Sequence, residues 1–449
     1  MRKIEEVFQR GLDMHHYANT AYPITPRSFQ EYKIKGKDEV DRLVVEEWEK
    51  VNALGLYVHI PFCMRRCKFC EYAVFTGDDA AQEELYVKLL LQEIDKFGAA
   101  LSPKIIHGLD IGGGTPSAIS VSNLGRIMNG LVKNFGDDAV GDVSIETTPR
   151  IAAKDSEKIK GIRELGIDRI SMGVQTINPK LLAEFERHGS TRMYYNAKEN
   201  IRKAGFERFN IDVMYGFLKQ TDESFMATLE FVLQLNPEYV TLYRNRYKDT
   251  KLEHEAVDVD LVKVNRQYKM AYYFLTAAGY NAELGKNTFS RVKGDVGTSA
   301  YLTKRVIEGM PYLGMGVASQ SYSHSSLYYN QGAASKRLSG YKKWIEKGHF
   351  PIQDFYILPE EEMAAKMISV AFYFGYIHKT HFHNRIGKTL EELYTDEMQF
   401  LIENKLMEHQ GDLFAFTQKG KNAINGITAL FYSKKEQEKM YTYATKLGL

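Results

Sequence analysis

Short apolar runs rich in β-branched residues alternate with longer amphipathic segments through the middle of the chain. The apolar runs have the length of strands, and most precede a segment with helical periodicity. Alternating strands and helices predict a parallel sheet with right-handed crossovers, and six such units predict a partial (β/α)6 barrel of the TIM type. The predicted strands are 56–60, 105–111, 143–145, 169–172, 210–214 and 239–242, and the predicted helices are 83–97, 121–134, 156–165 and 191–204.

The alternation weakens after residue 250. A helix is predicted over 264–278, and the remainder of 265–345 is irregular and rich in Gly, Ser and Tyr. Two helical stretches, 360–374 and 389–404, then precede a hairpin signal around Gly411 and Asp412. Helices followed by a hairpin predict a winged-helix-like α+β unit, which we expect to pack on the barrel or cover the substrate. The predicted organisation is an N-terminal arm with a short helix (1–50), the barrel (51–250), a barrel extension with a Gly-rich region (251–350) and the winged-helix-like domain (351–449).

Composition and charge exclude several kinds of partner. An apolar content of 44% is ordinary for a globular protein with a sizeable core. The formal charge of +2, from 59 basic and 57 acidic residues, gives no general attraction to nucleic acid or to an anionic membrane, so we expect neither partner. The longest apolar stretch, 367–377, is too short to span a bilayer, and the first residues do not resemble a secretory signal. We therefore expect a cytoplasmic protein.

The only three cysteines of the 449 residues are Cys63, Cys67 and Cys70. Unpaired thiols clustered in this way fit a reducing compartment and a soft metal centre. A structural zinc site needs four ligands, so three thiolates would require an imidazole, for example that of His59. Buried, inert thiols are disfavoured by the three basic residues between the cysteines, which lower thiol pKa values. An iron–sulfur cluster with one iron left open is the best fit.

Consecutive glycines follow the second predicted strand, at positions 112–114, and Thr115 and Pro116 come next. Glycines allow the backbone to approach a ligand closely. The run is not a dinucleotide-binding motif, because Ser117 stands where that motif needs glycine, and it lacks the Lys of a P-loop. A plain strand-to-helix turn is the alternative interpretation.

Polar side chains stand at three successive predicted strands, namely Glu146, Gln175 and Asp212. A polar group inside an apolar barrel is costly unless it is satisfied, so these residues predict a polar ring around a polar ligand. Hydrogen bonds within the barrel are the alternative.

The cysteine spacing Cys-x3-Cys-x2-Cys resembles the signature of the radical S-adenosylmethionine (SAM) superfamily. The preceding run, 57–63, is similar to the subgroup of oxygen-independent coproporphyrinogen III oxidases (HemN-like), and the resemblance extends from about residue 18 to about residue 420. It implies a [4Fe-4S] cluster, one or two SAM molecules, and cleavage of SAM to a 5′-deoxyadenosyl radical that abstracts hydrogen from a small-molecule substrate. We further expect a flavodoxin- or ferredoxin-type electron donor and a monomer. The resemblance assigns SAM contacts to Tyr57, Gly113, Gly114, Thr115, Glu146, Gln175, Arg187 and Asp212.

Candidate substrate contacts follow the sixth predicted strand, where Tyr243, Arg244 and Arg246 belong to a run that interleaves basic and aromatic residues. Such a run can hold a flat, anionic molecule, or it can be a solvated loop. Gly314 and Gly316 resemble a glycine-rich stretch that lies near a second SAM or the substrate in the same subgroup, or they form a buried turn. The sequence assigns no catalytic side chain.

Three departures from the subgroup leave the reaction open. Tyr72 occupies the position where the oxidases carry a fourth cysteine. The motif of the related haem-chaperone branch, His-Asn-x-x-Tyr-Trp, is missing around Tyr329 and Asn330, and the Pro-Gly usually found before Gln220 is replaced. Residues 20–23 still resemble the substrate-side N-terminal arm of the oxidases. The candidate functions are thus a coproporphyrinogen dehydrogenase-like oxidoreductase of porphyrin metabolism, a C-methyltransferase that uses two SAM molecules on an aromatic substrate, and a haem-binding or haem-delivery protein.

Overall fold

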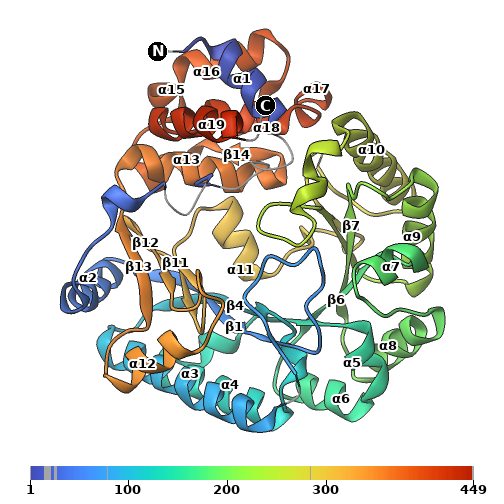
Figure 1. Ribbon diagram of the computed structural model, residues 1–449, viewed down its shortest axis with the longest axis vertical. Coiled ribbons are helices and arrows are strands. Elements are labelled where there is room, and N and C mark those ends of the chain that lie inside the picture. The colour runs from blue at the N-terminus through green and yellow to red at the C-terminus, as the bar shows by residue number, and fades with distance from the viewer. Residues whose placement is uncertain (1, 15–21, 25–27, 78, 284, 447–449) are drawn as a thin grey trace.

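Six parallel strands form the centre of the molecule, in the order β1-β4-β5-β6-β7-β8. The computed structural model describes residues 2–14, 22–24, 28–77, 79–283 and 285–446. All six strands predicted from the sequence are present, and together they make the partial barrel (Figure 1). The strands are β1 (Ala53–Ile60), β4 (Ile105–Gly113), β5 (Val143–Thr147), β6 (Arg169–Gln175), β7 (Arg208–Tyr215) and β8 (Tyr239–Arg244).

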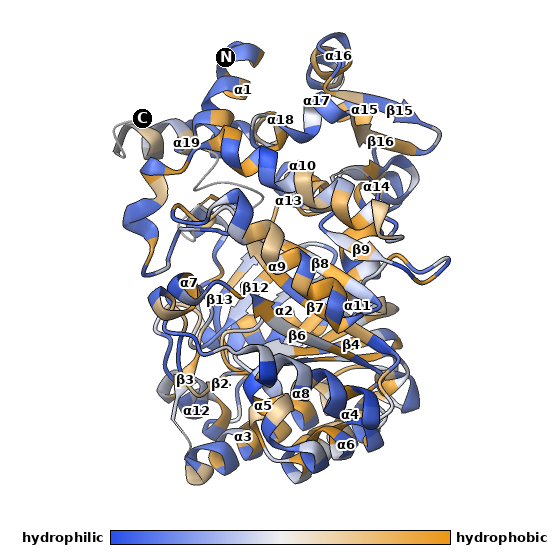
Figure 2. Ribbon diagram, turned by 90° about the vertical axis from the view of Figure 1, so that its right-hand side faces the viewer, coloured by the Kyte–Doolittle hydropathy of each residue, from blue (hydrophilic) through white to orange (hydrophobic). Residues whose placement is uncertain are grey.

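The strands are buried on both faces, as expected for parallel strands covered by helices. In β6, six of the seven residues are buried. Each of the eight covering helices named below is preceded by a polar residue whose side chain accepts a backbone N–H of the first turn, so each helix begins where the sequence supplies a cap. Figure 2 shows hydrophobic residues on the strands and hydrophilic residues on the outer helix surfaces. The helices are α3 (Ala80–Ala100), α4 (Val121–Phe135), α5 (Pro149–Lys154), α6 (Ser156–Glu164), α7 (Pro179–Glu184), α8 (Thr191–Lys203), α9 (Asp222–Leu235) and α10 (Leu261–Ala277).

The region predicted to be irregular contains strands, so that prediction was wrong. The central sheet continues from β1 into β10, which is parallel to it, and then into three antiparallel strands, while β9 pairs with β8 at the other edge. These strands are short and rich in Ser and Tyr, which hides the apolar alternation of a longer strand. They are β9 (Thr288–Ser290), β10 (Tyr312–Met315), β11 (Gln320–Tyr322), β12 (Ser326–Asn330) and β13 (Ile352–Ile357); α11 (Ala300–Leu302) precedes β10 and α12 (Ser339–Glu346) precedes β13.

A smaller α+β unit lies beside the barrel, at the side between the two edges of the sheet (top of Figure 1). The predicted hairpin is present as β15 and β16, and β14 completes a three-stranded sheet. The helix predicted over 389–404 is interrupted at Tyr394, which separates α15 from α16. The elements of this unit are α13 (Glu360–Ala371), the 3-10 turn η6 (Phe372–Phe374), β14 (Tyr376–His378), α14 (Lys379–Ile386), α15 (Leu390–Leu393), α16 (Thr395–Glu403), β15 (Met407–Gln410), β16 (Leu413–Phe416), α17 (Gln418–Lys421), α18 (Ile424–Leu430) and α19 (Lys434–Lys446).

The N-terminal segment contains two helices that pack in different places. Helix α1 (Ile4–Asp13) lies among the C-terminal helices, as the blue helix beside the red ones in Figure 1. Helix α2 (Lys37–Glu49) packs on the barrel, where Trp48 donates a hydrogen bond of 2.7 Å to the hydroxyl of Tyr328. Within the described residues, no helix combines the length and apolarity needed to cross a bilayer. The domain limits given from the sequence stay predictions.

Candidate functional site

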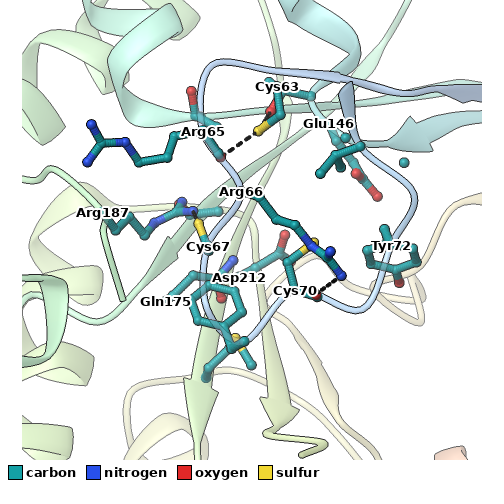
Figure 3. A pocket seen from close by; sticks show the side chains of 18 of the residues that line it. Cys63, Arg65, Arg66, Cys67, Cys70, Tyr72, Glu146, Gln175, Arg187 and Asp212 are labelled. Atoms are coloured by element: carbon teal, nitrogen blue, oxygen red, sulfur yellow. Dashed lines mark hydrogen bonds between the residues drawn. The ribbon is translucent and has the colours of Figure 1, made fainter. Parts of the chain in front are cut away.

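A cavity of about 320 Å³ opens at the carboxyl ends of the barrel strands (Figure 3). This is the edge at which the parallel strands of a barrel place their functional side chains. All three cysteines line it, together with the glycine run, the polar strand-end residues and part of the run after β8. The cavity thus joins segments that are far apart in the sequence.

The cysteine loop is closed by two short strands, β2 (Phe62–Cys63) and β3 (Phe75–Thr76), which pair in parallel. Inside the loop, the Cys70 N–H donates to the Cys67 carbonyl at 3.1 Å, and Arg66 donates to the Cys70 carbonyl at 2.9 Å. The three thiols are free and partly exposed. Their loop is therefore ordered by its own backbone, with the sulfur atoms accessible from the cavity.

Three neighbouring groups contact the sulfur atoms of Cys63 and Cys67. The Cys63 thiol donates to the Arg65 carbonyl at 3.2 Å. The Cys63 Sγ lies 3.4 Å from the Thr115 hydroxyl, and Arg187 Nη1 donates to the Cys67 Sγ at 3.3 Å. Arg187 therefore lies at the cavity wall beside one of the three sulfur atoms. Its role as a SAM contact stays a prediction.

His59 is engaged elsewhere. Its Nδ1 lies 3.3 Å from the Tyr57 hydroxyl and its Nε2 lies 3.1 Å from the Ala73 carbonyl. Burial lowers the pKa of His59 to about 4, so the ring is neutral.

Among the residues that the structure describes, no group of three His, Cys, Asp or Glu is arranged to hold a metal ion. In a cluster each cysteine binds a different iron, so the thiols need only face one cavity.

The glycine run brings the backbone against the cysteine loop. The Gly114 N–H donates to the Ile60 carbonyl at 2.8 Å, and the Thr115 N–H donates to the Phe62 carbonyl at 2.7 Å. A Cβ at Gly114 would lie 2.6 Å from the Phe62 carbonyl oxygen. At Gly113, where φ is +117°, a Cβ would lie 2.6 Å from the His59 ring. Glycine is required at these positions because the run packs closely against the cysteine loop and His59. Gly113 and Gly114, called the glycine cradle below, also line the cavity.

Glu146, Gln175 and Asp212 come from β5, β6 and β7 and line the same cavity (Figure 3). Asp212 accepts hydrogen bonds from Ser171 (2.9 Å) and Asn210 (2.7 Å), so part of its polarity is satisfied within the barrel. Gln175 has a φ of +67°, and its buried Oε1 lacks a hydrogen-bond partner. Such a backbone conformation is rare outside glycine and is often found at functional sites.

Burial raises the proton affinity of both carboxyl groups of this ring. Burial within the barrel and the nearby Asp212 raise the pKa of Glu146 to about 8. Burial also raises the pKa of Asp212. The Glu146 side chain remains accessible to solvent from the cavity. A cationic or hydrogen-donating ligand would stabilise the carboxylate forms, so the ring suits such a ligand.

Tyr57 is the one assigned SAM contact that does not line the cavity. It lies on β1 with its ring stacked on Tyr301, at a centroid distance of 6.1 Å. Its hydroxyl lies near His59, as described above.

The run of basic and aromatic residues 243–248, which begins in the last two residues of β8, is not a solvated loop. Tyr243, Arg244 and Arg246 line the cavity, while Tyr247 is 1% exposed and donates its hydroxyl to the Gly216 carbonyl at 3.0 Å. Arg246 forms an ion pair with Glu71, the residue after the third cysteine. This ion pair connects the β8 end to the cysteine loop.

Gly314 and Gly316 lie outside the cavity lining. The Gly314 N–H donates to Ser321 at 2.9 Å, and the Gly316 N–H donates to the buried carboxyl of Glu93 at 2.7 Å. Both glycines serve contacts within the sheet extension.

Of the aromatic residues that line the cavity, Phe69, Tyr72 and Tyr373 were not among the contacts predicted from the sequence. Tyr72 is 51% exposed and was noted only as a replaced cysteine, and Tyr373 comes from η6 of the C-terminal unit. Tyr72 could have been identified because it lies two residues after a cysteine of the loop. Tyr373 gives no local signal, because it lies in a helical segment distant in sequence from the barrel.

Comparison with known proteins agrees with this geometry. The model of the radical SAM superfamily matches residues 57–232. Residues 57–232, which include the cysteine loop and strands β4 to β7, are thus similar to the radical SAM superfamily. A heme chaperone HemW of Buchnera aphidicola subsp. Acyrthosiphon pisum is 24% identical over 395 residues, which cover 84% of this chain and 98% of that protein. The oxygen-independent coproporphyrinogen III oxidase of Escherichia coli K12 is 28% identical over 349 residues, covering 75% of this chain and 74% of the oxidase.

The solved structure of coproporphyrinogen III oxidase (HemN) from Escherichia coli has the same fold, with a TM-score of 0.72 at 24% identity over 89% of this chain and 94% of that chain. The radical SAM family implies a [4Fe-4S] cluster and SAM. The residues described above fit both groups: three accessible thiols face one cavity, a glycine cradle stands beside them, and a buried amide oxygen lacks a partner. Relatives carry names of two functions, chaperone and oxidase.

Proposed function

We propose that this protein is a radical SAM enzyme that abstracts hydrogen from a planar, anionic organic substrate, with a tetrapyrrole of the coproporphyrinogen type as the leading candidate. The observation that carries the proposal is the single cavity that unites the three thiols, the polar ring and the aromatic and basic residues after β8. Cofactor-binding and substrate-binding groups would thus share one cavity, which brings the radical and the substrate close together.

The cofactor side of the cavity is formed by the cysteine loop and the strand ends. Cys63, Cys67 and Cys70 would hold the cluster, and the glycine cradle with Glu146, Gln175 and Asp212 would hold SAM. When bound and reduced, these groups supply a 5′-deoxyadenosyl radical. The chain's own residues orient SAM by hydrogen bonds and keep the site apart from bulk water.

The substrate side is formed by three tyrosines and two arginines. Tyr72, Tyr243 and Tyr373 come from the cysteine loop, β8 and the C-terminal unit, and all line the cavity. Aromatic rings suit a flat ligand, and guanidinium groups pair with carboxylates. Arg244 and Arg246 supply this charge.

The proposal is tested by anaerobic reconstitution with iron and sulfide, followed by addition of SAM, a reductant and coproporphyrinogen III. We expect 5′-deoxyadenosine, and a substrate that has lost carbon dioxide; such decarboxylation also needs an acceptor for one electron. Cys67→Ala should lose the cluster's visible absorption and the formation of 5′-deoxyadenosine, whereas Glu164→Ala, an exposed change on α6, should lose neither. A Cys67→Ala protein with a full iron complement would contradict the ligand assignment.

Haem binding is a second candidate function. It is favoured by the relatives named as heme chaperones, one of which is covered along 98% of its length, and by Tyr72 at the position of the oxidases' fourth cysteine. Titration with haem distinguishes the two functions. Stoichiometric haem binding without turnover of coproporphyrinogen III would support delivery, and decarboxylation would support the oxidase-like reaction.

A further inference from the structure

A second, smaller cavity of about 50 Å³ lies beside the main one, between the barrel and the C-terminal unit. Arg244 and Tyr373 line both cavities, so the two are adjacent. Its other walls come from β7, β8, α10 and the segment from α17 to α18. Figures 1 and 2 both show α10 next to α17.

Lys421 supplies one positive charge to this cavity from the C-terminal unit. Its Nζ donates to the Gly285 carbonyl at 3.1 Å and lies 4.1 Å from the centroid of the Tyr268 ring. Burial lowers the pKa of Lys421 to about 7, and the positive charge of Arg244 contributes to the same effect. The ammonium is therefore poorly solvated in the absence of an anion.

Arg244 supplies the second positive charge from the end of β8. Its Nη1 donates to the amide oxygen of Asn425 at 3.1 Å. Among the described residues that line this cavity, none is acidic. Two cations in one poorly solvated space repel each other, and an anion between them would replace this repulsion with attraction.

We propose that the second cavity binds a carboxylate substituent of the substrate, held by Lys421 and Arg244, while the body of the molecule occupies the main cavity. A volume of about 50 Å³ exceeds the roughly 10–15 Å³ that one water needs, which suits a carboxylate but is too small for a ring system. The role in substrate binding rests on the proposed function, whereas the anion site itself stands on the two cations and the cavity.

The anion site is tested by NMR titration of the full-length protein, labelled with [ε-13C]lysine, with propionate. The resonance of Lys421 is assigned by its absence from the spectrum of Lys421→Arg. We expect this signal to shift with saturation, and that of Lys419 to remain in place, because Lys419 belongs to the same helix but donates to the Asn404 carbonyl outside the cavity. A Lys421 shift that does not saturate, or an equal shift of Lys419, would overturn the site.

The substrate role is tested with coproporphyrin III and its tetramethyl ester, with binding followed by porphyrin fluorescence. Lys421→Gln should weaken binding of the acid about tenfold and leave binding of the ester unchanged, since it removes one charged hydrogen bond. Lys421→Arg should restore most of the affinity, which separates loss of charge from loss of folding, and Lys419→Gln is the matched control.

The outcomes separate the two proposals. If the chemical shift of Lys421 saturates with propionate but the wild type binds no coproporphyrin III, the anion site is supported and the tetrapyrrole assignment is wrong. If the wild type binds the acid and Lys421→Gln binds it equally well, the substrate role of the second cavity is wrong.

Discussion

At the scale of single residues, Glu146 is the group whose state depends most on what the cavity contains. Its carboxyl stands inside the barrel beside Asp212, yet solvent reaches it from the cavity. The sequence predicted this residue, Gln175 and Asp212 because a polar side chain in an apolar strand is conspicuous. It could not predict Tyr373, whose contact with the cavity depends on how two distant units pack.

Glu146→Gln should change how stability depends on pH. Since the pKa of Glu146 rises from 4.5 to about 8 in the folded protein, the native state retains a proton that the unfolded chain has released between these values. The stability of the ligand-free protein therefore falls as pH rises through that window. The glutamine side chain does not titrate. The melting temperature of the variant, relative to that of the wild type, should therefore increase as the pH rises from 5.5 to 8.5.

The measurement is thermal unfolding of cluster-free protein at constant ionic strength. Glu230→Gln, an exposed change on α9, is the control and should leave the pH dependence unaltered. A difference between Glu146→Gln and wild type that is the same at every pH would contradict the expectation.

At the scale of elements, the strands with long apolar runs were predictable and the short ones were not. The six central strands combine burial on both faces with β-branched residues, which gives a strong local pattern. Strands β9 to β13 are held by pairing with neighbours that the local sequence does not reveal. The packing of α1 on α18 is a similar case, because it depends on Gly11 and Gly426, which are far apart in the chain.

Gly11→Val should loosen α1 from the C-terminal unit. A Cβ at Gly11 would lie 2.6 Å from the Ala429 Cβ and 2.7 Å from the Asn425 carbonyl oxygen, so the helices would have to separate. We expect a loss of about 1–3 kcal/mol in the free energy of unfolding, measured by chemical denaturation, and faster proteolysis near α1. Glu6→Ala, on the exposed side of the same helix, should show neither effect. An unchanged midpoint for Gly11→Val would mean that the helix does not pack in this way.

At the scale of the whole molecule, a buried network joins the N-terminal segment to the C-terminal unit. Glu436 is fully buried and accepts hydrogen bonds from the Ile24 N–H at 2.5 Å and the Ser28 hydroxyl at 2.7 Å. Nearby, the Tyr22 hydroxyl donates to Glu362. The sequence suggested an arm, but a contact between segments over four hundred residues apart cannot be read from local periodicity.

Glu436→Ala should destabilise the C-terminal unit more than the barrel. Removing the carboxylate leaves a buried N–H and a buried hydroxyl without this acceptor, at a cost of about 1–3 kcal/mol. We expect calorimetry to resolve an earlier transition for the C-terminal unit. Glu438→Ala, which removes an exposed ion pair with Arg2, is the control and should keep the wild-type profile. One unaltered transition for Glu436→Ala would show that the network contributes little.

The docking of α1 on α18 has a consequence for biosynthesis. The cysteine loop and all six central strands are complete in the chain by Arg244, whereas the surface that receives α1 is made of residues from 400 onward, namely Phe400 and the helices α18 and α19. During translation the cysteine loop and its strands are therefore synthesised well before the unit that packs beside them. A cluster delivered to the nascent chain would meet the cavity before the wall that carries Tyr373 exists.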